Sequence, residues 1–435
     1  TPFPSLGLIV MDEEQENSYK SESTPKYHAR ETALEVAKLY GASVVLGSAT
    51  PSLEAYYRAG RGEYRLLQLT KRLTGGELPT VYTVDLRQEL QEGNRSIFSR
   101  KLQELMTDRL NKGQQTILFL NRRGYAGFVS CRSCGEVMKC PHCDVSLSEH
   151  KGGRLICHYC GYTQPMPKLC PKCGSKYILG FKAGTQQIEE KLKELYPGVR
   201  TLRMDADTTR TKDSYEKILS SFANGEADVL IGTQMIVKGH DFPKVTLVGI
   251  LAADLSLNAS DYRAGERTFQ LLTQAVGRAG RGVLPGEAVI QTYQPDHYAI
   301  TCAAAQDYES FYQEEILYRE LSGYPPVAHM LAVQIYGKEE ENVKQLALRL
   351  TDVVKSNMDF LSGKQKEQSN KKIQVLGPAP ANISKINDIY RYVFYVKHAE
   401  YDVLVEVKDR LEETLRQWQS RQMSIQFDFD PVSVL

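Results

Sequence analysis

Apolar and polar positions along the chain follow two patterns, short apolar runs and longer amphipathic stretches. The apolar runs, rich in Val, Ile and Leu, occupy residues 6–11, 43–46, 116–120, 199–204, 228–231, 245–251 and 288–293. Helical periodicity lies between them, for example at residues 99–110, 187–196 and 263–276. Short runs without polar alternation are typical of parallel strands buried on both faces. The pattern therefore predicts an α/β fold with parallel sheets.

The pattern changes after Tyr324-Pro325-Pro326. A strand at 331–336 and a long helix at 340–361 are expected there, followed by a polar stretch and a turn at Gly377-Pro378-Ala379-Pro380. Two further strands and a helix complete the chain. This part predicts a separate α+β domain of about 110 residues.

Chain length, charge and apolar runs limit the number of domains and the kinds of partner that the protein can have. A chain of 435 residues is expected to form two to four domains. Its net charge of +1 provides no overall attraction to nucleic acid, but residues 131–182 carry eight Lys or Arg side chains against three acids. No apolar run approaches the ~20 residues that span a bilayer, and no secretory signal opens the chain. We expect no membrane association and a cytoplasmic location.

Eight of the nine cysteines form four Cys-x2-Cys pairs. The pairs are Cys131/Cys134, Cys140/Cys143, Cys157/Cys160 and Cys170/Cys173. A two-residue gap lets one tight turn offer two thiolates to a tetrahedral Zn²⁺ ion. The alternative is a disulfide framework, which is typical of small secreted domains. The spacing predicts two zinc sites.

The grouping of the pairs can be inferred from the segment between them. Residues 144–156 have the pattern of a hairpin with a turn at 151–153, which would place Cys140/Cys143 beside Cys157/Cys160. The outer pairs then share the second ion, in a nested arrangement. Neighbour pairing, with Cys131 to Cys143 around one ion, is the alternative. His142 and His158 could also act as ligands, but with eight cysteines present we expect them to be exposed.

Candidate catalytic residues follow two of the predicted strands. Asp12-Glu13-Glu14-Gln15 comes directly after the first run, and Gly47-Ser48-Ala49-Thr50 after the second. In a P-loop nucleotidase such a strand end supplies an Asp for Mg²⁺ and a Glu that orients water. An acidic loop is also common without that role, and small hydroxyl residues suit an ordinary helix N-cap.

A third motif contains two arginines near the end of a helix. Residues 274–281 read Gln-Ala-Val-Gly-Arg-Ala-Gly-Arg, so Arg278 and Arg281 lie three positions apart. The planar guanidinium group spreads positive charge over a phosphoryl transition state. The alternative is a pair of surface arginines beside a glycine C-cap.

In this order, the motifs at 12–15, 48–50, 232–243 and 274–281 resemble motifs II, III, V and VI of superfamily-two helicases. The cysteine insert between residues 119–125 and 184–187 is similar to that of the bacterial primosomal replication-restart helicases. The resemblance covers essentially the whole chain. It implies RecA-like lobes with parallel sheets, the first only partial, an inserted two-zinc module and a C-terminal α+β domain. The implied units are 1–78 (half of lobe one), 79–130 with 181–323 (lobe two, motifs IV to VI), 131–180 (zinc insert) and 324–435 (DNA- and partner-binding domain).

The resemblance also implies residue roles. Asp12 would hold Mg²⁺, Glu13 would polarise water, and Ser48 and Thr50 would couple hydrolysis to movement. Nucleotide contacts would fall to Asp12, Glu13, Gly239, Asp241, Arg278 and Arg281, with Gln274 in the catalytic set. Contacts with the DNA backbone would fall to Thr233, Gln234 and Lys238, and those of an aromatic-rich loop with single-stranded DNA to Tyr19, Lys20, Tyr27 and Arg30. In the last domain, Lys385, Arg391 and Tyr392 would form either a DNA-contacting face or a solvated strand edge.

The implied activity is ATP-dependent 3′-to-5′ DNA unwinding at stalled or abandoned forks and D-loops, followed by primosome assembly. Two Zn²⁺ ions, Mg²⁺ and ATP are the expected cofactors. Branched and single-stranded DNA, primosomal proteins and single-stranded DNA-binding protein are the expected partners in the bacterial nucleoid. No Gly-x4-Gly-Lys-Ser/Thr loop occurs in the sequence, so we expect these residues to belong to a longer protein and to be inactive alone. The alternatives are a non-catalytic zinc-dependent platform for DNA and primosomal proteins, and a different translocase, which the cysteine insert disfavours.

Overall fold

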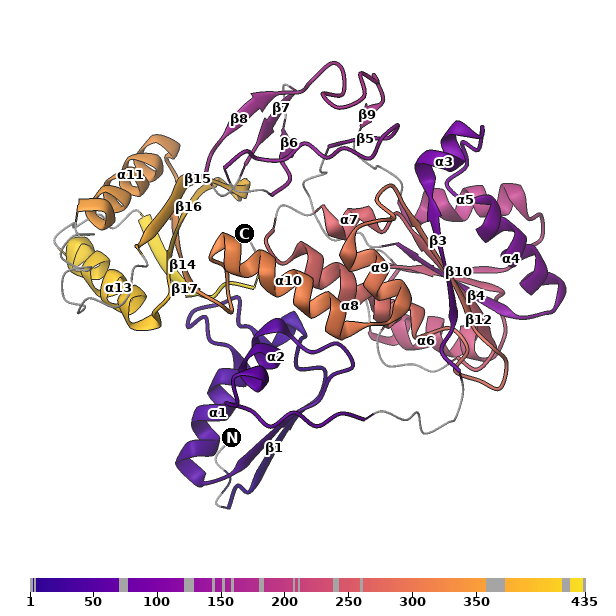
Figure 1. The fold of residues 1–435 in the computed structure, drawn as a ribbon, viewed down its shortest axis with the longest axis horizontal. Coiled ribbons are helices and arrows are strands. Elements are labelled where there is room, and N and C mark those ends of the chain that lie inside the picture. The colour runs from indigo at the N-terminus through magenta and orange to yellow at the C-terminus, as the bar shows by residue number, and fades with distance from the viewer. Residues whose placement is uncertain are drawn as a thin grey trace.

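The computed structural model describes residues 3, 5–69, 77–120, 129–142, 145–150, 153–157, 160–179, 184–205, 208–209, 212–237, 242–258, 261–356, 372–416 and 423–432. We divide them into an N-terminal unit (5–69), a central domain (77–120 with 184–322), a cysteine-rich module (129–179) and a C-terminal domain (324–432). Figure 1 shows the N-terminal unit below the central helices, the module above them, and the C-terminal domain on the opposite side from the central sheet. No helix among the described residues has both the length and the apolar character that a bilayer crossing requires.

The N-terminal unit is built on two parallel strands. β1 (Leu8–Met11) pairs with β2 (Ser43–Leu46), and α1 (Ala29–Tyr40) makes the crossover between them. Met11 lies opposite Leu46, so the polar residues that follow both strands meet at one edge. A short 3-10 helix, η1 (Asn17–Tyr19), follows β1, and α2 (Leu53–Gly60) follows β2. Both predicted strands are confirmed.

The central domain contains a six-stranded parallel sheet with the order β10-β11-β4-β12-β13-β3. Its strands are β3 (Thr80–Asp85), β4 (Gln115–Leu120), β10 (Thr201–Met204), β11 (Val229–Gly232), β12 (Val245–Leu251) and β13 (Glu287–Thr292). Every residue of β4, β11 and β12 is buried, which explains their apolar runs. β3 was not predicted, because threonine and aspartate interrupt its apolar residues and leave no long apolar run.

Helices cover both faces of this sheet. They are α3 (Leu86–Gln91), α4 (Arg100–Asn111), α5 (Thr185–Leu195), α6 (Lys212–Ala223), η2 (Gln234–Val237), α7 (Asp254–Leu257), α8 (Ala264–Val276), α9 (Tyr298–Ala305) and α10 (Tyr308–Ser322). Leu102 of α4 and Leu192 of α5 share a core with one face of the sheet, whereas Phe222 of α6 and Phe269 of α8 pack on the other. The result is a three-layer α/β domain that confirms the predicted fold class.

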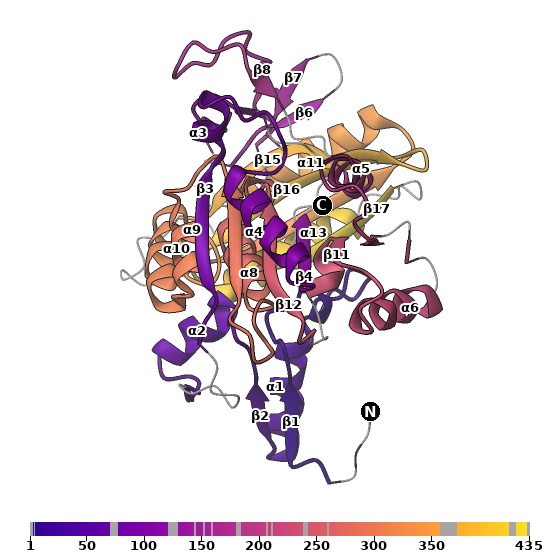
Figure 2. The same ribbon diagram turned by 90° about the vertical axis from the view of Figure 1, so that its right-hand side faces the viewer.

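The cysteine-rich module leaves the central domain after β4 and returns before α5 (Figures 1 and 2). β5 (Ser130–Cys131) pairs with β9 (Ile178–Leu179) at its base. β6 (Ser148–His150), β7 (Arg154–Ile156) and β8 (Thr163–Pro165) form an antiparallel meander. The predicted hairpin is confirmed, since Ser148 lies opposite Ile156; residues 151 and 152 of its predicted turn lie outside the described part.

The C-terminal domain has an antiparallel sheet with the order β15-β16-β14-β17. Its elements are β14 (His329–Gly337), α11 (Glu340–Ser356), β15 (Gln374–Ile386), β16 (Ile389–His398), α13 (Tyr401–Arg416) and β17 (Met423–Phe429). The final strand was not predicted. Residues 357–361 of the predicted long helix lie outside the described part.

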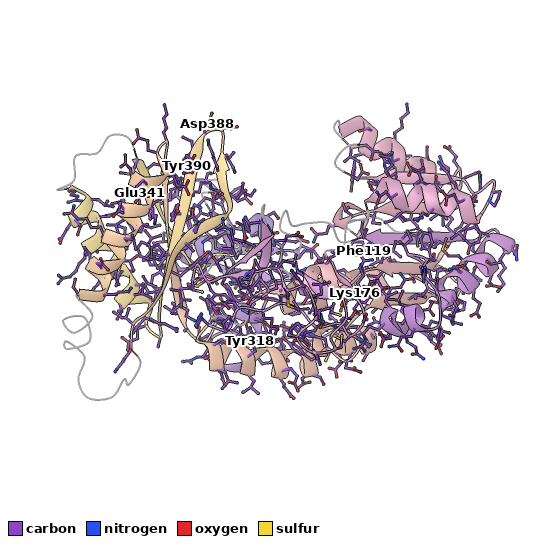
Figure 3. The ribbon with its side chains drawn as sticks, turned by 90° about the horizontal axis from the view of Figure 1, so that it is seen from above. Phe119, Lys176, Tyr318, Glu341, Asp388 and Tyr390 are labelled. Carbon is purple, nitrogen blue, oxygen red and sulfur yellow. The ribbon has the colours of Figure 1, made fainter. Side chains whose placement is uncertain are left out.

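The turn predicted at residues 377–380 is wrong. These residues lie within β15, where the register with β16 shifts between Leu376 and Ala379. Proline lacks the N–H that a ladder needs, and an edge strand with a bulge tolerates that loss. The actual turn is at Asn387-Asp388, where both residues have positive φ, as a two-residue hairpin turn requires. Figure 3 shows Asp388 and Tyr390 at the outer end of this hairpin, far from Phe119 in the central sheet.

Candidate metal sites and inter-unit contacts

All four Cys-x2-Cys segments begin with the same backbone turn. The N–H of the first cysteine donates to the carbonyl oxygen five residues later, at 2.8 Å in each case. The pairs are Cys131 with Glu136, Cys140 with Val145, Cys157 with Tyr162, and Cys170 with Ser175. Gly135, Gly161 and Gly174 close three of these turns at φ of 78°, 78° and 71°, which glycine adopts without strain from a Cβ. We call these four turns the knuckles.

The outer pairs of cysteines come together. The Sγ atoms of Cys131, Cys134, Cys170 and Cys173 all lie within 4.8 Å of one another. Cys131 is 3.6 Å from Cys173, and Cys134 is 3.6 Å from Cys170. Four sulfurs at ~2.3 Å around one Zn²⁺ ion would be about 3.8 Å apart, so this group fits that ion. The arrangement is the nested one and not neighbour pairing.

The inner group is described for three of its four cysteines. The Sγ atoms of Cys140, Cys157 and Cys160 cluster, and Cys140 is 3.6 Å from Cys160. Cys143 and His158 lie outside the described residues. His142 is exposed and packs edge-on against Tyr162. No disulfide joins the described cysteines, which contradicts a disulfide framework.

One side of α8 faces the strand ends of the N-terminal unit. Gln274 Nε2 lies 3.5 Å from Glu13 Oε2, and Gln270 Nε2 lies 3.5 Å from Thr50 O. Glu266 Oε1 accepts a 3.0 Å hydrogen bond from Leu53 N, the first residue of α2. Residues four apart on a helix lie on one face, so these three α8 side chains form one stripe. Sequence reasoning identified Gln274 and missed Glu266 and Gln270, although the four-residue spacing was a visible signal.

Other predicted functional residues at the ends of β1 and β2 lie along the same edge. Ser48 Oγ donates to Gln15 Oε1 at 2.5 Å, and Thr50 is fully buried. A Cβ at Gly47 would lie 3.5 Å from Asp12 Oδ1, so the second strand end closely approaches that carboxylate. The structure thus gathers motifs II and III at one edge, with Gln274 of motif VI opposite them.

The remaining motif residues are only partly described. Arg281 is exposed, and its Nε donates to Gly277 O at 2.9 Å. Arg278, three residues earlier, is half-buried in the turn that follows α8. Thr233 and Gln234 follow β11 at its carboxyl end. Lys238, Gly239 and Asp241 lie outside the described residues.

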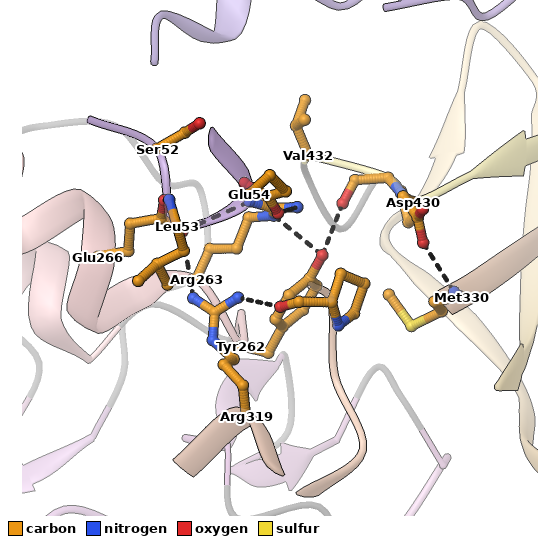
Figure 4. A network of polar contacts seen from close by, with 12 residues as sticks. Ser52, Leu53, Glu54, Tyr262, Arg263, Glu266, Arg319, Met330, Asp430 and Val432 are labelled. Atoms are coloured by element: carbon orange, nitrogen blue, oxygen red, sulfur yellow. Dashed lines mark hydrogen bonds and ion pairs between the residues drawn. The ribbon is translucent and has the colours of Figure 1, made fainter. Parts of the chain in front are cut away.

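A buried charge network joins the N-terminal unit to the central helices (Figure 4). Arg263 contacts Glu54 at 2.6 Å and Glu266 at 3.4 Å, and Arg319 contacts Glu266 at 3.2 Å and Glu315 at 2.7 Å. Burial raises the pKa of Glu266. Burial also opposes ionisation of Glu54, but the adjacent Arg263 outweighs it and holds the pKa of Glu54 below its ordinary value.

The network continues into the C-terminal domain. The Tyr262 hydroxyl accepts a hydrogen bond from Arg263 Nε at 2.9 Å and donates to Pro431 O at 3.1 Å. Its ring stacks on Tyr324 with centroids 4.6 Å apart. Arg267 donates to Val432 O. Three units therefore meet at the start of α8 (Figure 4).

Comparison with known proteins matches three families along the chain. Residues 320–432 match the Primosomal protein N C-terminal domain, residues 140–165 the PriA DNA helicase Cys-rich region (CRR) domain, and residues 169–283 the Helicase conserved C-terminal domain. The chain belongs to the PriA family.

Three PriA relatives illustrate the match. The Replication restart protein PriA of Bacillus subtilis is 45% identical over 100% of this chain and 53% of its own length. Those of Synechocystis and Haemophilus influenzae are 42% and 36% identical over 100% and 99% of this chain, and over 52% and 57% of their own lengths. The chain thus spans about half the length of these relatives. Among solved structures, that of S. cerevisiae Dbp5 bound to RNA and ADP BeF3 aligns with 73% of this chain and 63% of the Dbp5 chain. The TM-score is 0.36 and the sequence identity 13%, so no conclusion is drawn from this match.

Two cations of the aromatic-rich loop in this PriA-family chain point into the protein. Lys20 pairs with Asp428 at 2.7 Å and Arg30 pairs with Glu14 at 3.0 Å, and both cations are buried. Their charges are therefore neutralised internally, contrary to the prediction that they face DNA. Tyr27 is 53% exposed, whereas the Tyr19 hydroxyl donates to Asp12 O at 2.8 Å.

The C-terminal residues expected to form either a DNA-contacting face or a solvated strand edge differ in their exposure. Lys385 is partly exposed, pairs with Asp388 at 2.9 Å and lies over the Tyr390 ring. Arg391 lies over the Tyr336 ring. Tyr392 is buried in the core beneath α11 and is not a surface contact.

Proposed function

We propose that this chain is part of an ATP-dependent 3′-to-5′ DNA helicase that recognises stalled or abandoned replication forks and D-loops, unwinds DNA and initiates primosome assembly. The proposal rests on the contact between Gln274, on α8 of the central domain, and Glu13, which follows β1 of the N-terminal unit. This contact occurs in a PriA-family chain that carries the cysteine-rich module between β4 and α5. The units proposed are the partial lobe one at 1–78, lobe two at 79–130 and 181–323, the zinc insert at 131–180 and the C-terminal binding domain at 324–435.

Residue roles follow from the arrangement of the strand ends. Asp12 would hold Mg²⁺ and Glu13 would orient the attacking water, while Arg278 and Arg281 would neutralise charge on the phosphates. Bound Mg-ATP supplies the energy of phosphoryl transfer. Gly239 and Asp241 complete the nucleotide contacts, and Ser48 and Thr50 transmit the change at β2 to α2.

DNA contacts are proposed for two groups of residues. Thr233 and Gln234, which follow β11 at the carboxyl edge of the sheet, would contact the DNA backbone together with Lys238. Tyr27, which is exposed, would stack on an unpaired base, and Tyr19 lies near Asp12 to report that contact. Lys20 and Arg30 support this loop from inside the protein.

The module is proposed to bind two Zn²⁺ ions. One ion takes Cys131, Cys134, Cys170 and Cys173, and the other takes Cys140, Cys143, Cys157 and Cys160. Such ions hold short, loop-rich segments in one fold, because these segments have too little core to do so alone.

The sequence contains no phosphate-binding loop, and we propose that these residues alone do not hydrolyse ATP. The complete protein would act in the bacterial cytoplasm at the nucleoid, with branched DNA, primosomal proteins and single-stranded DNA-binding protein as partners. The test measures DNA-stimulated ATP hydrolysis and fork unwinding by the full-length protein, its Glu13→Gln variant and this 435-residue chain. We expect activity only in the first. Turnover by this chain, purified free of other ATPases, would refute the proposal that these residues alone do not hydrolyse ATP. A full-length protein without activity would refute the proposed helicase function.

A zinc-dependent platform for DNA and primosomal proteins is the second candidate. It is favoured by one observation: all eight ligand cysteines are within this chain, whereas the phosphate-binding loop is not. The test is binding of forked DNA and primosomal proteins to this chain before and after zinc chelation. Unchanged binding after loss of both ions would exclude a zinc-dependent platform.

A further inference from the structure

The knuckle closed by Gly135, which belongs to the outer metal group, packs against the central domain. A Cβ at Gly135 would lie only 2.6 Å from Tyr293 O, the carbonyl that follows β13. Arg87 of α3 reaches the same knuckle, and its Nη1 donates to Cys134 O at 3.4 Å. The contact is therefore between backbones, and glycine is required both by its φ of 78° and by the lack of space.

The knuckle closed by Gly161, which belongs to the inner metal group, packs against the C-terminal domain. A Cβ at Gly161 would lie 3.6 Å from both Ala379 Cβ and Pro378 O. These two residues belong to the bulge of β15, where the strand departs from regular pairing with β16. The bulge thus presents the edge strand to the knuckle. The Gly135 and Gly161 knuckles therefore contact different units.

The knuckle that ends at Gly174 serves as a comparison within the same molecule. Its φ of 71° is close to that of Gly161, and its backbone hydrogen bonds are the same. No atom of the described residues lies within 4 Å of a Cβ built at Gly174. The local geometry of the turn is therefore not sufficient for docking. Whether a knuckle contacts another unit depends on its position in the module.

One face of the C-terminal sheet is buried by the module. Along β14 and β16, side chains alternate between two cores. Leu331, Val333 and Phe394 pack beneath α11 and α13. Met330, Ala332, Val393 and Tyr395 share a core with Leu147 and Leu155 of the module. Both sets are buried, and Tyr262 and Tyr324 also belong to the second core, so loss of the module would expose part of this face to water.

The arrangement in space agrees with these contacts. In Figure 1 the module spans the top of the molecule, with β6, β7 and β8 above β15 and β16, and with β5 and β9 on the side of the central domain. Figure 2, turned by 90°, also places the module against β15. The module therefore adds a further contact between two units that also meet directly at the start of α8.

We propose that the cysteine-rich module is a metal-dependent bridge that holds the C-terminal domain in place against the central domain. The outer metal group shapes the knuckle that docks on Tyr293, and the inner group shapes the knuckle that docks on the β15 bulge. Loss of the inner metal loosens the C-terminal sheet and leaves the central sheet intact. This proposal rests on the metal binding proposed above but not on helicase activity.

The test uses hydrogen exchange on this 435-residue chain, with zinc content measured on every sample. Gly161→Asn and Gly174→Asn form a matched pair, because asparagine tolerates positive φ and only position 161 faces another unit. We expect Gly161→Asn to speed exchange about tenfold in residues 374–398 while exchange in residues 287–292 stays unchanged. Gly174→Asn is expected to change neither. Gly135→Asn is expected to act on residues 287–292 instead.

Reversible metal removal provides a second measurement, which does not depend on whether a variant folds. Chelation of zinc from the unaltered chain is expected to speed exchange in residues 374–398, and added zinc is expected to restore protection. Unchanged protection of these residues in the zinc-free chain would overturn the bridge. A chain that binds no zinc at any point would instead refute the metal sites themselves, so the two failures are distinguishable.

Discussion

Lys20 Nζ lies 2.7 Å from Asp428 Oδ1, so the loop that follows the first strand is held by the last strand of the chain. Lys26 Nζ lies 3.9 Å from the other oxygen of the same carboxylate and 3.0 Å from Gln334 Oε1. The side chains of Lys20 and Asp428 are only 6% and 8% exposed. The aromatic-rich loop cannot leave the C-terminal sheet without exposing or separating these buried charges.

Asp428→Asn is expected to destabilise the chain by about 3 kcal/mol, because it leaves a buried lysine without a counter-charge. Chemical denaturation measures the change. Asp388→Asn is the matched control, because it removes the partner of Lys385 from a pair in which the aspartate side chain is 92% exposed. We expect the control to change stability little, because this ion pair is exposed to solvent. Equal effects from both variants would contradict the assignment of Asp428 as an internal anchor.

Glu266→Gln is expected to cost about 3 kcal/mol. The change leaves Arg263 and Arg319 facing each other with one fewer carboxylate and weakens the cap on Leu53 N. Gln270→Ala, one turn further along the same face, removes only a 3.5 Å contact and is expected to cost less than about 1 kcal/mol. Denaturation of both variants checks the order, and exchange at the start of α2 should rise only in Glu266→Gln.

Two histidines predict a loss of stability in mild acid. His28 and His297 each use Nδ1 to accept the hydrogen bond of a helix N-cap, from Arg30 N and Ala299 N, which requires an unprotonated nitrogen. Burial lowers the pKa of both to about 4 from 6.5. Because the unfolded chain binds these protons more readily, the stabilisation is complete above pH 6.5 and is lost as the pH falls from 6.5 toward 4.

The pH prediction is tested with asparagine, which caps a helix without titrating in this range. His28→Asn and His297→Asn are expected to match the unaltered chain at pH 7.5. At pH 5 each variant should retain about 1–2 kcal/mol that the unaltered chain loses. Release of zinc in acid affects all the chains alike, so the difference between variants isolates the histidines. Parallel pH profiles would contradict the capping role.

Zinc content tests the inner site directly. The unaltered chain is expected to bind two zinc ions, and Cys143→Ser is expected to bind one tightly. Cys302→Ser is the control, because Cys302 lies in α9 and outside both cysteine groups. Metal analysis after dialysis measures both. Two tightly bound ions in Cys143→Ser would show that another residue completes the inner group.

Local pattern predicted most of the elements and part of the site. Parallel strands buried on both faces must be apolar throughout, so β4, β11 and β12 were visible as runs. The cysteine spacing indicated the ligand groups because two thiols on one turn need only local geometry. The edge strand β3 and the bulged β15 were missed or misread, because edge strands carry polar residues and prolines that also mark turns.

The sequence by itself determined which residues could bind a metal, which strands could be buried and where the motifs end their strands. These properties depend on side-chain chemistry and on neighbours close in the chain. Only the tertiary structure decided that Lys20 and Arg30 point inward, that Glu266 caps α2, and that the knuckles of Gly135 and Gly161 dock on different units while that of Gly174 does not. The reason is that burial and long-range pairing arise when distant elements pack together, and identical local turns acquire different surroundings in that process.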